Sequence, residues 1–123
     1  PDGRVAVVGN TTNMSDDNAV LLVFDREGVL LWSAGIGDPG RQRFNDVVFV
    51  DDGGVVIAGE HEGSFMFMSE EVPHVIGLDA FVLSYDAEGE PRWARSFTNS
   101  IAASAEGVVT AADGGVYVVG QNN

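Results

Sequence analysis

The chain of 123 residues contains no cysteine and no lysine. The lack of cysteine excludes disulfides, thiolate zinc sites and cysteine nucleophiles, and the lack of lysine excludes a phosphate-binding loop of the glycine-rich, lysine-containing type. Basic residues are few: the chain has six arginines and 19 acidic residues, which gives a net charge of −13. That charge repels nucleic acid and anionic membrane surfaces, so we expect neither as a partner.

Long apolar runs are missing too. No segment approaches the roughly 18 to 20 apolar residues that span a bilayer, and the chain does not open with a basic and apolar signal segment. The first residues, Pro1-Asp2-Gly3, fall inside a pattern that recurs from Asp52 onward. We therefore expect the chain to be a segment of a longer protein.

What the sequence does contain is internal repetition. Three segments share an Asp-Gly turn, a run of β-branched residues and a closing glycine, and they occupy residues 2–9, 52–59 and 113–120. Their spacing is unequal, because the connection after the second copy is longer than the one after the first. A second unit consists of two apolar runs that flank an Asp-x-Glu-Gly turn and close on a tryptophan; it occupies residues 18–35 and again 79–97. Both patterns predict hairpins.

Two further strands are predicted at residues 46–50 and 107–111, directly before Asp-Gly turns, whereas residues 33–43 and 98–105 are interpreted as linkers. No window shows the apolar period of a helix. We therefore predict an all-β chain of about nine strands. A four-stranded antiparallel unit that recurs along the chain favours β-propeller blades. A β-sandwich is the alternative, although its strands need not repeat in sequence.

Residues 77–86, 89–97 and 113–120 resemble bacterial SBBP-type propeller repeats. The resemblance implies a β-propeller fragment from a secreted or cell-surface bacterial protein, with no general catalytic activity and no catalytic residues to assign. It divides the single segment 1–123 into a partial blade at 1–44, a complete blade at 45–97 and the start of another at 98–123. The strands at 46–50 and 107–111 would be innermost, and the tryptophan strands outermost.

The pattern Asp-x-Glu-Gly-x-x-x-Trp is also similar to the quinoprotein-type repeat. Here it is one residue shorter and lacks the threonine before the glycine. No basic or metal-ligating cluster suited to a quinone accompanies it. We interpret these residues as a turn and a packed aromatic anchor.

The connection at residues 60–78 differs most between the copies and holds the weak metal candidates His61, Glu62 and His74. Their nitrogen and oxygen atoms would suit zinc or manganese, but the spacing matches no metalloprotease motif, so a solvated acidic loop is favoured. Asp16 and Asp17 suggest calcium, yet the regular ligand spacing of a calcium loop is absent. We therefore predict no cofactor, with calcium as the weak alternative.

The same connection carries an apolar cluster, Phe65, Met66, Phe67 and Met68. It is interpreted as a short strand packed over the blade, with an adaptable binding patch as the functional alternative. Both histidines lie on this one connection, and no nucleophile motif is present, so we predict that the chain is not an enzyme.

The prediction for function is a non-catalytic repeat scaffold or binding module of a bacterial secreted or cell-surface protein. Its partner would be an unidentified protein or glycan, together with the remaining blades of a parent chain or further copies of itself. One alternative is part of a propeller enzyme, a glycan-active hydrolase or lyase, with catalytic residues elsewhere. The other is a self-associating structural module.

Overall fold

The computed structural model describes residues 2–12, 17–37, 40–74, 77–97 and 102–122. These residues form strands and turns, which confirms the prediction of an all-β chain. The eleven strands are β1 (Val5–Thr12), β2 (Asp17–Phe24), β3 (Leu30–Ile36), β4 (Arg41–Phe49), β5 (Val55–Glu62), β6 (Phe65–Phe67), β7 (Glu70–Val72), β8 (Asp79–Tyr85), β9 (Pro91–Phe97), β10 (Ala103–Thr110) and β11 (Val116–Asn122). The predicted number of nine was wrong because β6 and β7 form a hairpin inside the connection that follows β5.

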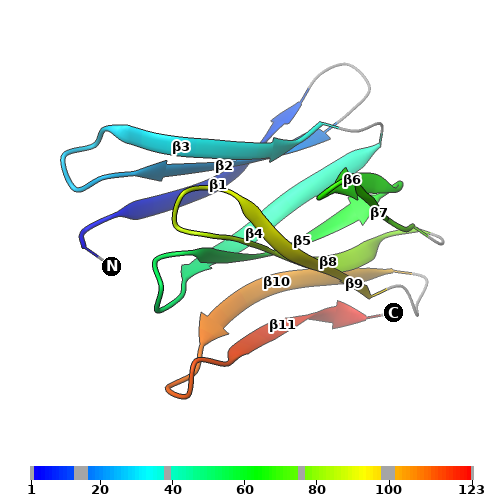
Figure 1. The fold of residues 1–123 in the computed structure, drawn as a ribbon. Helices are drawn as coiled ribbons and strands as arrows, with labels where there is room; N and C mark the ends of the chain where they lie inside the picture. The colour runs from blue at the N-terminus through cyan, green and yellow to red at the C-terminus, as the bar shows by residue number, and fades with distance from the viewer. Residues whose placement is uncertain (1, 13–16, 38–39, 75–76, 98–101, 123) are drawn as a thin grey trace.

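The strands group into three units that follow the sequence repeat. Unit A is the antiparallel sheet of β1, β2 and β3, unit B pairs β4, β5, β8 and β9 in order, and unit C is the hairpin of β10 and β11. A single parallel bridge between Asp17 and Arg41 joins units A and B into one seven-stranded sheet. Figure 1 shows the units stacked in sequence order, with unit A at one end of the molecule and unit C at the other.

Repetition extends to the irregular positions of the strands. The pairing of β2 with β3 shifts register between Val23 and Phe24, and the pairing of β8 with β9 shifts at the equivalent positions of the next copy, Ser84 and Tyr85. The β4–β5 and β10–β11 pairs also carry matching shifts. Bulges bend and twist a strand locally, so equivalent strands curve in the same way.

The turns repeat because their side-chain chemistry repeats. Asp25 Oδ1 accepts hydrogen bonds from the backbone N–H groups of Glu27 and Val29, each at 2.9 Å. The carboxylate of Asp86 does the same in unit B. In each turn the glycine adopts a positive φ, +86° at Gly28 and +91° at Gly89. The Asp closes the turn and the Gly supplies the left-handed backbone.

Several strands extend into segments that the sequence pattern marks as linkers or loop. Strand β4 begins at Arg41, five residues before the predicted start at residue 46, and β10 begins at Ala103 rather than residue 107. Strand β5 continues through His61 to Glu62. Cross-strand pairing with β4 keeps this polar end of β5 extended, since Arg41 lies opposite Glu62.

Two apolar cores lie between the units. The first joins the facing sides of units A and B and contains Leu21, Val23, Ile57 and Phe81 among its buried residues. The second joins units B and C and contains smaller side chains such as Ala58 and Val82. Both faces of unit B are therefore buried, one against unit A and the other against unit C. Helices of the length and apolarity needed to cross a membrane do not occur in the part of the chain that the structure describes.

Candidate functional site

A groove of about 360 Å³ lies between the β6–β7 hairpin and strand β9. One wall is the hairpin and the other is the backbone and side chains of β9, which pairs with β8 within the seven-stranded sheet and ends that sheet's strand order. The lining combines apolar and charged residues: Phe67, Met68, Glu70, Glu71, Val72, Pro73, Arg92, Trp93, Ala94, Arg95 and Ser96.

Alternation along β6 fixes the hairpin on the sheet. Phe65 and Phe67 point into the core between units A and B, whereas Met66 and Met68 are exposed. The phenylalanines of the predicted four-residue patch are thus core residues, and this placement agrees with a short strand packed over the sheet. Of the two methionines, Met68 lines the groove. A binding role for the patch stays a prediction.

The hairpin turns through Met68 and Ser69, which adopt φ values of +56° and +62°. Two positive φ values in a two-residue loop match the twist of a hairpin, but glycine and asparagine adopt them far more readily than methionine or serine. Such backbone strain is a feature of binding and catalytic loops. The turn therefore holds Met68, a residue of the groove lining, at a conformational cost.

His61 fastens the hairpin connection to β9 from inside the core. Its Nδ1–H donates to the carbonyl oxygen of Gly63 at 2.9 Å. Burial lowers the pKa of His61 below its ordinary value of 6.5, so the ring is neutral at pH 7. With Nδ1 carrying the proton, Nε2 accepts from the hydroxyl of Ser96, 3.1 Å away. The Phe65 ring packs edge-on against the His61 ring, with 5.0 Å between the two ring centres.

The Ser96–His61 pair has the proton arrangement of a nucleophile and its base. A carbonyl oxygen, from Gly63, orients the imidazole, whereas in a serine-histidine-aspartate triad a carboxylate holds the ring and stabilises its charged form. The lowered pKa of His61 also makes it a weak base. We therefore interpret the pair as a structural link between hairpin and edge strand.

His74 closes the other end of the hairpin connection. Its backbone N–H donates to Ser64 Oγ at 3.1 Å, and its Nε2 donates to the carbonyl oxygen of Gly77 at 2.7 Å. The two imidazole rings lie 6.0 Å apart, centre to centre. The predicted metal candidates His61 and His74 are thus neighbours, each hydrogen-bonded to a backbone carbonyl.

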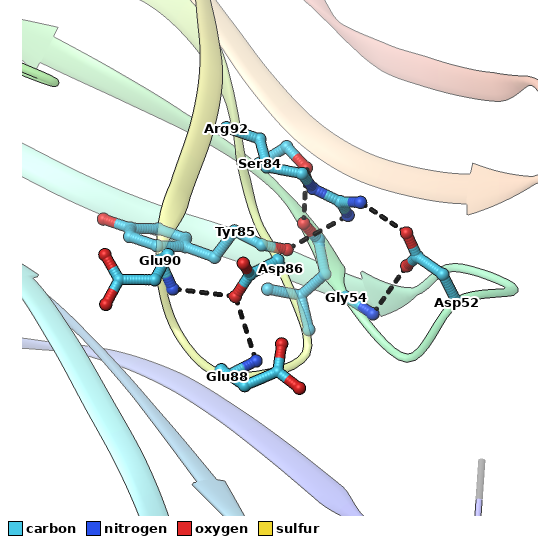
Figure 2. Close-up of polar contacts among 9 residues, drawn as sticks. Asp52, Gly54, Ser84, Tyr85, Asp86, Glu88, Glu90 and Arg92 are labelled. Atoms are coloured by element: carbon cyan, nitrogen blue, oxygen red, sulfur yellow. Dashed lines mark hydrogen bonds and ion pairs between the residues drawn. The ribbon is translucent and has the colours of Figure 1, made fainter.

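Arg92 forms a fixed part of the groove wall. Its guanidinium donates to Asp52 Oδ2 at 2.5 Å, to the carbonyl oxygen of Tyr85 at 3.1 Å and to Ser84 Oγ at 3.2 Å. Figure 2 shows Arg92 reaching from β9 across to the Asp52 turn, where the same carboxylate also accepts from the N–H of Gly54. The hydrogen bond from Gly54 and, next, the one from Arg92 lower the pKa of Asp52. Arg92 therefore links the β4–β5 turn, through Asp52, to the start of the β8–β9 turn, through Tyr85.

Arg95 is the exposed cation of the groove. Its guanidinium carbon lies 5.9 Å from the centre of the Trp93 ring, within the range of a cation–π contact. Its Nη1 donates to the carbonyl oxygen of Ala94 at 2.8 Å. Because the opposite wall carries Glu70 and Glu71, the groove offers both signs of charge beside an aromatic surface.

The other metal candidates are Asp16, Asp17 and Glu62. Asp16 lies outside the described residues. Asp17 accepts from Arg43 at 2.9 Å and lies 3.5 Å from Arg41, and the bond from Arg43 is the main cause of its lowered pKa. Glu62 is exposed at the end of β5. Among the described residues, no three His, Asp or Glu side chains lie close enough together to hold a metal ion.

Sequence reasoning missed the β9 side of the groove. Arg92, Arg95 and Ser96 occupy the positions that Leu31, Ala34 and Gly35 hold in the otherwise similar unit A. The two copies keep the tryptophan and the turn but exchange these neighbours. The positions at which the two aligned repeats differ could therefore have indicated the β9 side of the groove.

No protein-family model matches the chain. Nor is any curated protein similar enough to be matched with it. The repeated units and the groove itself are therefore the basis for assigning a function.

Proposed function

We propose that the chain is a non-catalytic repeat scaffold of the β-propeller type, from a bacterial secreted or cell-surface protein with SBBP-type repeats. Unit B supplies a complete four-stranded blade, and units A and C supply parts of its neighbours. The three-layer stack with equivalent bulges and turns supports this proposal. In this arrangement β4 and β10 are the innermost strands and β9 is an outermost strand.

The scaffold's binding function lies in the groove between β9 and the β6–β7 hairpin. One observation carries this assignment: the hairpin is an insertion found in unit B, and it creates the groove beside a sheet edge. An edge strand offers backbone N–H and C=O groups to an added strand, while neighbouring pockets select side chains. We infer that the ligand is an extended peptide segment of a partner protein, with apolar side chains against Met68 and Trp93.

The charge of the groove narrows the choice of peptide. Glu70 and Glu71 face a ligand from one wall, and the protein as a whole carries a charge of −13. A peptide that combines a basic residue with apolar ones complements both the wall and the long-range field. A glycan ligand, which would stack on Trp93, is the alternative outcome of the same experiment.

The test is a selection of random 15-residue peptides displayed on phage, with a glycan array run in parallel. We expect enriched peptides of extended, basic and apolar character, whose binding weakens at least tenfold in Met68→Ala and in the double variant Glu70→Gln/Glu71→Gln. Met66→Ala is the matched control, because Met66 lies on the same hairpin and outside the groove lining. Peptides that bind the Met68 variant as tightly as the wild type, or glycans alone, would refute the peptide assignment.

A second candidate, part of an enzyme, has one observation in its favour, the hydrogen bond between Ser96 and His61. A fluorophosphonate probe reacts with an activated serine hydroxyl and displaces fluoride. Labelling that disappears in Ser96→Ala and persists in Ser64→Ala would favour the enzyme. We expect no labelling, because His61 is a weak base without a carboxylate hydrogen-bonded to its Nδ1.

A further inference from the structure

The outward face of unit C is apolar and exposed. Val109 and Tyr117 lie directly opposite one another in the β10–β11 register, and Val119 follows on the same side because alternate residues share a face. Their exposed fractions are 59%, 65% and 66%. We call these three residues the trailing face. Its counterparts in unit B include Val56 and Ala58, which are 2% and 0% exposed under unit C.

The outward face of unit A shows the same contrast at the opposite end of the stack. Val5 and Val7 on β1 are 52% and 46% exposed. We call Val5 and Val7, together with Phe24 and Leu22, which lie opposite them on β2, the leading face. Their counterparts in unit B are Val55 and Ile57, both fully buried against unit A. Each end of the molecule therefore repeats a surface that another unit covers inside it.

The internal interfaces show what covers such a surface. A trailing-type face of one unit meets a leading-type face of the next, first between units A and B and again between units B and C. Directional bonds fix these contacts: Trp32 Nε1 donates to the carbonyl oxygen of Ala87 at 3.0 Å. In the second interface, Asp46 Oδ2 accepts from the N–H of Val108 at 2.9 Å. The repeat itself specifies a leading face as the occupant.

We propose that copies of this chain associate head to tail, with the trailing face of one copy on the leading face of the next. The inference rests on the repeated interfaces and is independent of the peptide groove. The two contacting surfaces are different, so the interface is heterologous and generates a closed ring or an open filament. Because each copy carries a charge of −13, repulsion opposes the contact and added salt strengthens it.

Sedimentation velocity of the 123-residue chain over a hundredfold concentration range tests the proposal. We expect oligomers larger than a dimer at high concentration, in greater amount at 0.5 M than at 0.05 M NaCl. Tyr117→Lys and Val7→Lys each place a charge on one face, and each should weaken association at least tenfold. Val29→Lys is the control, because the exposed fraction of Val29, 59%, lies between those of Val7 and Tyr117, and Val29 lies in the turn after β2.

Mixing the two face variants distinguishes this interface from any other. Tyr117→Lys retains an intact leading face and Val7→Lys an intact trailing face, so an equimolar mixture should form a dimer and stop there. Both variants must keep the wild-type circular dichroism spectrum; Val119→Lys and Val5→Lys replace any variant that does not. A wild-type chain that stays monomeric, single variants that associate normally, or a mixture that remains monomeric would each overturn the proposal.

Discussion

Two glycines offer a matched measurement of the contact between units A and B. Gly28 and Gly89 occupy equivalent turns and have nearly equal positive φ values, +86° and +91°. They differ in their surroundings. A Cβ added to Gly89 would lie 2.7 Å from Cδ2 of Trp32, whereas a Cβ on Gly28 would meet nothing within 4 Å. Substitution by alanine therefore strains both turns equally but overpacks only one interface.

The expected costs follow from these two effects. A left-handed backbone disfavours alanine by about 1–2 kcal/mol, and this is the whole expected loss for Gly28→Ala. Gly89→Ala adds overpacking against an indole ring, which costs about 1–3 kcal/mol more. Trp32 can relieve the clash only by giving up its hydrogen bond to Ala87 or its contact with Tyr85, whose ring centre is 6.0 Å away.

Urea denaturation followed by far-ultraviolet circular dichroism measures both variants, alone and in a Trp32→Ala background. Removal of the indole should reduce the cost of Gly89→Ala to that of Gly28→Ala, giving a coupling energy of about 1–3 kcal/mol between residues 32 and 89. The cost of Gly28→Ala should not change. Equal losses for the two glycine variants, or a coupling energy near zero, would show that the units do not pack through this ring.

Two further predictions concern polar groups. Because burial lowers the pKa of His61, the unfolded state binds a proton before the folded state does, so stability should fall as the pH drops below about 6.5. Urea midpoints between pH 7.5 and 4.5 should show this fall in the wild type but not in His61→Gln; an unchanged profile in the variant would assign the effect to other groups. Arg92→Leu, which copies Leu31 of unit A, should destabilise by about 1–2 kcal/mol in the same assay. Asp52→Asn should cost under about 1 kcal/mol because the Asp52 side chain is 60% exposed, and the reverse order would contradict the assigned role of Arg92.

The turns could be predicted from sequence because their chemistry is local. An aspartate three residues before a glycine closes the β2–β3 turn and the β8–β9 turn with its own side chain, as Asp25 and Asp86 show. The strands on either side carry β-branched and apolar residues. Such features depend on a few neighbouring residues, so a single sequence reveals them.

The starts of β4 and β10 could not be predicted in this way. Residues 41–43, Arg-Gln-Arg, carry no apolar alternation, yet Gln42 is fully buried and lies opposite His61 on β5. The sequence pattern places the start of this strand at Asp46, which is an interior residue of β4. The Asp46 carboxylate accepts a hydrogen bond from Val108 of unit C, a contact that the local sequence does not indicate. Tertiary pairing keeps these residues extended, and local propensity does not record it.

The groove depends on residues that distinguish unit B from the other units. The hairpin follows His61, where units A and C have Thr11 and Asn122, and its hydrogen-bond partner Ser96 replaces Gly35 of unit A. Neither threonine nor glycine at these positions could form the imidazole–hydroxyl bond that ties the hairpin connection to β9. The inserted hairpin and both members of its anchor therefore occur in the same repeat. A longer loop alone would have left the edge of β9 uncovered, whereas the anchored hairpin gives that edge a fixed second wall, as a binding groove requires.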